Sequence, residues 1–277
     1  MSWVAIARRD FQNARRSRIL ALVVGLFVAL VGLLMLTGST GGETPAEDAL
    51  WTLHGIALFL MPIVMLVVAY LSVAGERETG RIQYLLGLPN RRWEVVLGKF
   101  VSRSLVAVLA VGLSMAVGLG IMFVRFDTVP VADAAGLAVF MLFLATVYIG
   151  LAVGISALTA TRARAMAGAI GVYVFFTVYW IVPTVNPQDS VSYVVEELLG
   201  LGPKEDLYEF VLLLSPSFAY DRLTNGLLFE RAQDGSELVD PGAPFYLQPE
   251  FMPVILVGWL ALALGVGYWR FRDAELG

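Results

Sequence analysis

Long uncharged apolar runs alternate with short charged segments along this chain of 277 residues. A helix that crosses the hydrocarbon core of a bilayer takes about 20 mostly apolar residues. Six uncharged runs are near or above that length, and they cover residues 19–42, 49–75, 104–124, 134–161, 165–188 and 251–269. The pattern therefore predicts an all-α integral membrane protein with six transmembrane helices, forming a single transmembrane domain over residues 1–277.

Composition and charge set the class and the orientation. Apolar residues make up 58% of the chain and the mean hydropathy is +0.76, which is more than one water-soluble core could bury. With six spans both termini lie on one side, and that side carries 15 of the 19 basic residues. Because retained basic loops mark the cytoplasm, we expect a multi-pass plasma-membrane protein with both termini cytoplasmic. The outer side is acidic, and only Lys99 and Lys204 are lysines, which favours a salt-rich habitat and a halophilic archaeon as the source.

The polar segment 1–18 precedes the first span. Its apolar residues recur at roughly helical spacing, and they are Trp3, Ile6, Ala7, Phe11 and Ala14. Arginines occupy several of the remaining positions, so the segment predicts an amphipathic elbow helix along the inner membrane surface. A basic anchor that only sets the topology is an alternative interpretation of this segment.

The main cytoplasmic connection, residues 76–99, joins the second and third spans. Ile82, Leu85 and Leu86 recur at i, i+3 and i+4, which predicts a short amphipathic helix. Gly87 and Pro89 end that helix, and Asn90 is placed to cap the helix that continues into the third span. A structured helix exposed to the cytoplasm needs a partner to pack against.

The longest polar region, residues 184–250, precedes the last span and forms a large extracytoplasmic loop. Its sequence predicts short amphipathic pieces over 191–199, 207–214 and 218–229. Breaks are expected at Pro203, at Ser215-Pro216 and at Gly226. The uncharged run 210–220 is too short to span and is typical of an interfacial or re-entrant piece. Residues 234–249 are rich in Gly and Pro and predict an exposed loop.

Two features within the spans concern packing and charge. Gly150 and Gly154 form a Gly-x-x-x-Gly motif, which lets helix backbones approach closely. Arg103 lies near the cytoplasmic start of the third span, and we expect it to extend its guanidinium to the headgroups. Ser156 and other small hydroxyl residues are expected to bond to neighbouring backbone rather than to act as nucleophiles.

Several kinds of chemistry are excluded by residue type. The chain has no cysteine and a single histidine, His54, so neither a His-Glu-x-x-His zinc motif nor a Ser-His-Asp triad can form. Gly98-Lys99 is followed by Phe100, which does not match the phosphate-binding loop of ATPases. We therefore predict no catalytic residues, no metal site and no cofactor in this chain, and we expect no nucleic-acid partner.

One stretch carries a family resemblance. It runs from Gly75-Glu76-Arg77-Glu78-Thr79-Gly80-Arg81 through Leu85-Leu86-Gly87-Leu88-Pro89-Asn90-Arg91-Arg92-Trp93-Glu94 to Leu97-Gly98-Lys99. With the elbow segment, the six spans and the outer loop, it resembles the permease subunits of type-2 ABC exporters. The opening Trp3-Val4-Ala5-Ile6-Ala7-Arg8-Arg9-Asp10-Phe11 looks like the branch linked to maturation of multicopper enzymes such as nitrous oxide reductase.

The resemblance implies a permease that moves a substrate by alternating access, paired with a second permease copy, most simply as a homodimer. Two copies of a separate ABC ATPase would bind and hydrolyse ATP with Mg, so this chain would not be an enzyme. Carried over by motif, the ATPase-coupling interface would comprise Glu76, Glu78, Gly80 and Arg81, with Ile82, Leu85 and Leu86 packing against the ATPase. The alternative for the two glutamates is a solvated helix start, which favours acidic groups.

Two other functions remain open from the residues. A secondary transporter normally places charged residues at mid-span for ion coupling, and no charged residue lies there in this sequence. A membrane scaffold or assembly factor for an extracytoplasmic copper enzyme would use the loop 184–250 as its docking surface. The substrate and the direction of transport are not encoded in a recognisable pattern.

Overall fold

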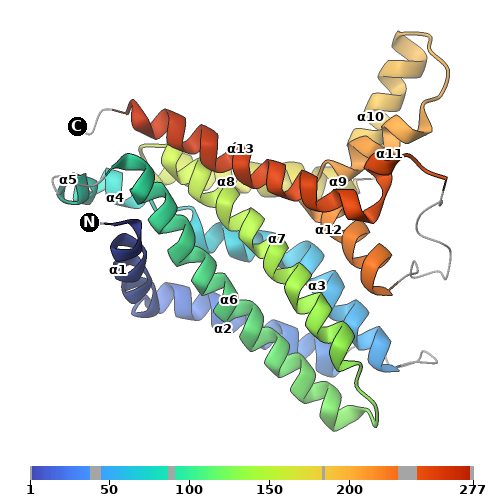
Figure 1. Cartoon of the computed structure of the whole chain (residues 1–277), viewed down its shortest axis with the longest axis horizontal. Helices are drawn as coiled ribbons and strands as arrows, with labels where there is room; N and C mark the ends of the chain where they lie inside the picture. The colour runs from blue at the N-terminus through green and yellow to red at the C-terminus, as the bar shows by residue number, and fades with distance from the viewer. Residues whose placement is uncertain (1, 38–44, 87–90, 183–184, 230–241, 275–277) are drawn as a thin grey trace. The chain divides into compact units, whose positions relative to one another are not determined.

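The computed structural model describes residues 2–37, 45–86, 91–182, 185–229 and 242–274 (Figure 1). Within these ranges the regular structure is entirely helical, which confirms the predicted all-α class. Six helices in the described part of the chain are long and apolar enough to cross a membrane, as predicted. They cover Arg18–Thr37, Ala46–Glu78, Arg92–Arg125, Val131–Leu158, Arg162–Ile181 and Pro249–Arg272.

The third span begins well before its uncharged run. Its helix begins at Arg92, whereas the uncharged run begins at Ser104. Arg91 occupies the N-cap position, and its backbone N–H donates to the Glu94 carboxylate at 2.7 Å. The predicted cap, Asn90, lies outside the described residues. Charged residues can occupy this helix end because several of them are paired with other helices, as shown below.

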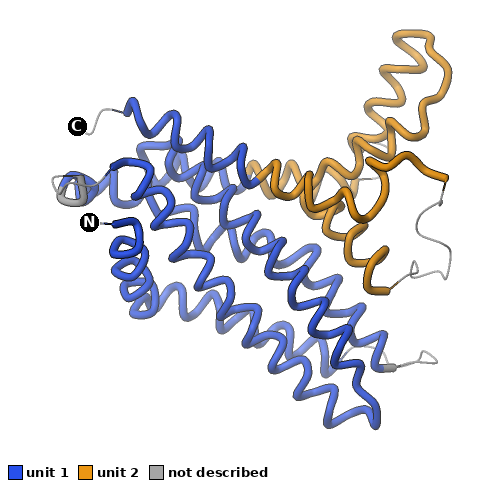
Figure 2. Tube along the Cα trace, in the orientation of Figure 1, with its two compact units in different colours: residues 1–170, 260–277 blue, residues 171–259 orange. Residues whose placement is uncertain are grey.

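The described chain divides into two compact units, residues 1–170 with 260–277 and residues 171–259 (Figure 2). Unit 1 contains α1 (Trp3–Arg15), α2 (Arg18–Thr37), α3 (Pro45–Ala69), α4 (Ala74–Glu78), α5 (Arg81–Leu86), α6 (Arg92–Arg125), α7 (Val131–Leu158), most of α8 (Arg162–Tyr173) and the second half of α13 (Met252–Arg272). The prediction of a single domain over the whole chain stays a prediction.

The core of unit 1 lies among α3, α6 and α7, with α2 packed on α3 and α6. Its largest fully buried side chains include Met61, Met65, Met122, Met141 and Tyr148, so methionine serves as core filler in these spans. The short helix α1 packs along the first turns of α6 (Figure 1). The apolar stripe of α1 therefore contacts protein, and Ile6, Ala7 and Ala14 are buried.

The Gly-x-x-x-Gly motif brings α7 against α13, which confirms the predicted close packing. A Cβ on Gly154 would lie 2.8 Å from the Ala263 carbonyl carbon, and a Cβ on Gly267 would lie 2.7 Å from the Gly154 Cα. Real side chains do not tolerate such distances to backbone. These glycines therefore allow two backbones to touch, which is the usual role of small residues between membrane helices.

Unit 2 contains the end of the fifth span, the predicted outer loop and the start of the last span. Its elements are η1 (Val174–Val178), α9 (Tyr179–Ile181), α10 (Pro187–Tyr193), η2 (Val194–Leu198), α11 (Glu205–Leu213), α12 (Pro216–Thr224), η3 (Asn225–Phe229), η4 (Phe245–Leu247) and η5 (Pro249–Phe251). The three predicted pieces correspond to α10 with η2, α11, and α12 with η3. The breaks at Pro203 and at Ser215 are confirmed, whereas the predicted break at Gly226 is wrong, because Gly226 lies inside the π-helical turn η3.

The predicted loop 234–249 is described only from residue 242 onward, where η4 and η5 form short 3₁₀ turns. Two indole groups bond to the end of α11 in unit 2. Trp180 Nε1 donates to the Leu212 carbonyl and Trp259 Nε1 to the Leu214 carbonyl, both at 2.8 Å. These carbonyls lie at the C-terminal end of α11, where intrahelical partners run out. Two tryptophans from spans thus hold the C-terminal end of α11.

Candidate functional site

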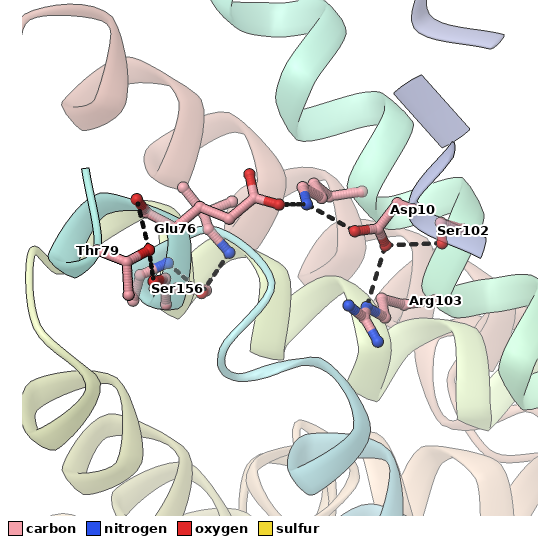
Figure 3. A network of polar contacts seen from close by, with 10 residues as sticks. Asp10, Glu76, Thr79, Ser102, Arg103 and Ser156 are labelled. Atoms are coloured by element: carbon pink, nitrogen blue, oxygen red, sulfur yellow. Dashed lines mark hydrogen bonds and ion pairs between the residues drawn. The ribbon is translucent and has the colours of Figure 1, made fainter. Parts of the chain in front are cut away.

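The candidate site is built around α4, a helix of five residues that follows α3. Its first N–H groups need acceptors from outside the helix. The Ser156 hydroxyl on α7 supplies one, accepting from the N–H of Val73 at 3.0 Å and of Ala74 at 2.9 Å (Figure 3). The predicted bond of Ser156 to neighbouring backbone is therefore confirmed, and it anchors the start of α4 on the end of the fourth span.

A buried polar network joins α4 to α1 and α6. Lys99 Nζ donates to Asp10 Oδ1 at 2.6 Å and also to the Glu76 carboxylate. Ser102 Oγ donates to Asp10 Oδ2 at 2.7 Å, and Arg103 Nε lies 3.3 Å from that same oxygen (Figure 3). We call Asp10, Glu76, Lys99, Ser102 and Arg103 the Lys99 network. It links three helices that are distant in sequence.

The charges of the Lys99 network balance. Two carboxylates, Asp10 and Glu76, face two cations, Lys99 and Arg103. Burial alone would raise the pKa of Asp10, but Lys99, Arg103 and the hydrogen bonds from Lys99 and Ser102 together hold it below its ordinary value. Asp10 is therefore ionised at neutral pH although it is only 5% exposed. An ion buried to this extent persists only when paired and hydrogen-bonded.

Gly98 lets α1 reach Lys99. A Cβ at position 98 would lie 2.8 Å from Ile6 Cγ2 and 3.0 Å from the Trp3 carbonyl oxygen. The missing side chain therefore allows α1 to lie directly on α6, and the next residue, Lys99, then meets Asp10. The Gly98-Lys99 pair thus has a packing and pairing role in this chain.

The remaining charged residues of α4 contact the turn between α7 and α8. Arg77 Nη1 donates to the carbonyls of Ala157 at 3.3 Å and of Thr159 at 2.9 Å. The Glu78 carboxylate accepts from the backbone N–H of Arg162. Helix α4 therefore has contacts to the ends of three spans: α6 through Glu76, α7 through Arg77 and α8 through Glu78.

Helix α5 follows α4 after a tight turn. Gly80 has φ of +70°, a left-handed conformation that glycine adopts without steric cost. Arg81 is exposed, but Ile82 is only 2% exposed and packs within this chain. The side chains of Leu85 and Leu86 lie outside the described part. Of the predicted interface residues, the structure thus gathers Glu76, Glu78 and Gly80 around α4.

Comparison with known proteins decides the class. The family described as ABC-2 family transporter protein matches residues 4–276. The chain belongs to the ABC-2 transporter family. It is therefore a multi-pass membrane protein, an ABC-2 permease.

Relatives of this ABC-2 permease carry related names. It is 28% identical to "Probable ABC transporter permease protein NosY" of Stutzerimonas stutzeri and 29% identical to the protein of that name in Pseudomonas aeruginosa, with 96% of each chain covered in both cases. It is also 28% identical to "Probable multidrug ABC transporter permease YbhR" of Escherichia coli, over 57% of this chain and 42% of that protein.

The sequence reasoning missed the partners within the permease. The interpretation of Arg103 as a residue that reaches the headgroups is wrong, because its side chain is 13% exposed and pairs with Asp10. A signal for Asp10 was present: it falls on the apolar stripe of α1 with Ile6, Ala7 and Ala14, where an acidic residue needs a buried cation. No pattern indicated that this cation is Lys99.

The chemistry available at this site is ion pairing and hydrogen bonding. Over the described ranges, no three His, Asp or Glu side chains gather where they could hold a metal ion. The arrangement is suited to holding α4 rigidly against three spans.

Proposed function

We propose that this ABC-2 permease is the transmembrane subunit of an ATP-driven exporter, powered by a separate ABC ATPase that binds ATP and Mg. Two ATPase copies and a second permease copy complete the transporter, and the substrate passes by alternating access. Family membership supports this proposal, as does the absence of a phosphate-binding loop from the sequence. The NosY relatives, named as probable ABC transporter permeases, match 96% of this chain and agree with the permease proposal. The link to copper-enzyme maturation is proposed from the resemblance of the opening segment, residues 3–11.

One observation carries the proposal for the mechanism. Helix α4 is attached to α6 through Glu76 and Lys99, to α7 through Arg77 and Ser156, and to α8 through Glu78. A displacement of α4 and α5 by a partner would therefore move the ends of three spans together. Rigid transmission of this kind needs packed polar contacts with little freedom, and the ion pairs of Lys99 with Asp10 and Glu76 are contacts of this type.

The contact with the ATPase is assigned to the exposed side of α4 and α5. Thr79 and Arg81 are exposed there, whereas Ile82 is buried within the permease. The roles of Leu85 and Leu86 stay predictions from the motif. The charge asymmetry of the loops supports a cytoplasmic location for this end, where an ATPase would find ATP.

The first test is to purify the chain from its native membrane in mild detergent and identify what co-purifies by mass spectrometry. We expect an ABC ATPase with vanadate-sensitive activity that depends on the permease. Glu76→Gln should lower that activity roughly five- to tenfold, since couplings between sites are typically 1–3 kcal/mol. Glu78→Gln should have a smaller effect on this activity, because the ion pair of Glu78 with the Arg162 side chain is largely exposed. Arg162 Nε and Glu78 Oε1 are 4.0 Å apart.

Glu209→Gln is the matched control, because it removes an ion pair with Arg222 in unit 2. It should leave the ATPase activity unchanged. Failure to recover any ATPase with a folded permease would contradict the proposal and favour a scaffold or a secondary carrier. If the ATPase activity is equally insensitive to Glu76→Gln and to Glu209→Gln, the Lys99 network is not part of the coupling mechanism.

A further inference from the structure

A basic cavity lies beside the site in unit 1, at the ends of α7, α8 and α13. Its volume is about 420 Å³, within the range of small-ligand pockets. Three arginines contribute to its lining, together with one acidic residue and the end of α7; these residues are Arg77, Arg164, Arg270, Asp273, Leu158 and Thr159. The coupling proposal uses neither Arg164 nor Arg270.

The positive charge of this cavity is only partly compensated. Among the described residues, Arg164 and Arg270 form no ion pair. Asp273, the acidic residue in the lining, is instead hydrogen-bonded to Arg272 at 3.1 Å. Guanidinium groups that converge on a cavity form charge-assisted, often bidentate hydrogen bonds with phosphate oxygens.

Two helix C-termini near the cavity would repel an anion, because their carbonyls carry partial negative charge. Arginines cover both of them. Arg77 donates to the last carbonyls of α7, and Arg92 Nη1 donates to the carbonyls of Phe271 at 2.7 Å, Arg272 at 2.8 Å and Ala274 at 2.8 Å. With these carbonyls satisfied, Asp273 is the acidic residue in the lining that faces the arginines, and its carboxylate interacts with Arg272, Arg92 and Arg270. The lining thus holds three arginines and one carboxylate.

The position of the cavity along the spans indicates the source of the anion. Three apolar helices meet beside the cavity. Two of them end there, at Leu158 and at Arg272, and the third begins there, at Arg162. Apolar helices of this length end where hydrocarbon gives way to lipid headgroups. Leu158, 39% exposed, adds an apolar wall next to the arginines. Basic pockets between spans at this depth suit anionic headgroups.

We propose that this cavity binds a phosphate group, supplied by the headgroup of an anionic phospholipid from the adjoining leaflet. Arg164 and Arg270 contact the phosphate oxygens, and Arg77 fixes the wall behind them. The site is independent of the ATPase-coupling proposal, since it requires neither a partner subunit nor transport.

The test uses the full chain in a neutral detergent, titrated with short-chain phosphatidylglycerol and read out as discrete lipid adducts by native mass spectrometry. We expect one saturable phosphatidylglycerol per chain. Arg164→Gln with Arg270→Gln should weaken that binding at least roughly tenfold, as expected for the loss of charge-assisted hydrogen bonds. Arg91→Gln with Lys204→Gln, two exposed basic residues outside the cavity lining, is the matched control and should change it less than about twofold.

A second arm distinguishes the sources of phosphate. Inorganic phosphate is added to the chain in phosphatidylcholine nanodiscs, and the unfolding temperature is followed by tryptophan fluorescence, which also verifies that both double variants fold. Stabilisation by inorganic phosphate that is lost in Arg164→Gln with Arg270→Gln supports the same site with a soluble ligand. No saturable binding of either probe, or an equal loss in both double variants, overturns the proposal. If Arg164→Gln with Arg270→Gln releases a co-purifying protein but leaves phosphatidylglycerol binding unchanged, the lipid proposal is also overturned, in favour of a protein contact.

Discussion

At the scale of single residues, the Lys99 ammonium lies between carboxylates from two different helices, Asp10 on α1 and Glu76 on α4. Removing such charges from water costs several kcal/mol per ion, so the network is stable only as a complete set. Replacing one member leaves another charge buried without its partner. The residues of the Lys99 network should therefore be more sensitive to substitution than the exposed charges of the same helices.

Asp10→Asn tests this sensitivity. The substitution should lower the thermal midpoint at pH 7, because breaking a buried pair typically costs about 3–5 kcal/mol. Asp127→Asn, which changes an exposed residue outside the network, should have little effect. Tryptophan fluorescence during heating in detergent measures both variants.

The pH dependence of the same pair gives a second readout. The pKa of Asp10 is lower in the folded state than its ordinary value of 3.8, so its stabilising contribution is complete above that value and is lost as the pH falls through the folded pKa. The difference in thermal midpoint between the wild type and Asp10→Asn, here called the gap, should therefore decrease as the pH is lowered from 7 toward 3. A gap that stays constant over this range would contradict the assigned charge state.

At the scale of elements, α4 is too short to be stable as an isolated helix. Its stability comes from the Ser156 hydroxyl at its start and from the contacts of Arg77 and Glu78 with the α7–α8 turn. The spans use a different device, since α7 and α13 meet backbone to backbone at Gly154 and Gly267. The Ser156 bond to α4 and the contact of Gly154 with Gly267 both lie in unit 1, and each depends on a small residue at one position.

Gly154→Ala and Gly112→Ala should have effects of opposite sign. At Gly154 the new methyl group meets the Ala263 backbone, and overpacking of this kind costs about 1–3 kcal/mol. At Gly112 no atom lies within 4 Å of the new methyl group, and alanine is the better helix former by about 1 kcal/mol. The thermal midpoints of the two variants provide the comparison, and equal shifts would show that α7 and α13 do not meet as described.

At the scale of the whole molecule, the distribution of basic residues predicts how the six spans are oriented. The loops on the side of the termini hold 15 of the 19 basic residues, and this bias predicts a cytoplasmic location for α1, α4 and α5. The proposed ATPase contact and the supply of lipid from the inner leaflet both depend on that orientation.

Single cysteines test the orientation directly, since the chain has none of its own. Gln12→Cys on α1 and Glu205→Cys at the start of α11 are both at exposed positions. In right-side-out vesicles, a membrane-impermeant maleimide should label Glu205→Cys at once and Gln12→Cys only after lysis. Labelling in the reverse order would place both termini outside and remove the proposed access of the ATPase to α4.

Local patterns were sufficient for much of this architecture. Span lengths follow from hydropathy over about 20 residues, and breaks such as Pro203 and Ser215-Pro216 follow from backbone chemistry at single positions. The motif around Glu76 and Gly80 identified the segment that becomes the candidate site. Gly226 shows where local reasoning fails, because its tertiary surroundings hold it inside a helical turn against Pro249.

The sequence by itself determined the all-α class, the number of spans, the close packing at Gly154 and the family resemblance, because each depends on neighbouring residues or on a contiguous motif. Only the tertiary structure decided which charges pair. Lys99 and Asp10 are 89 residues apart, and the arginines of the basic cavity come from three separate helices. Pairing at such separations depends on how helices pack against one another, since burial forces each charge to take whichever partner the packing brings within reach.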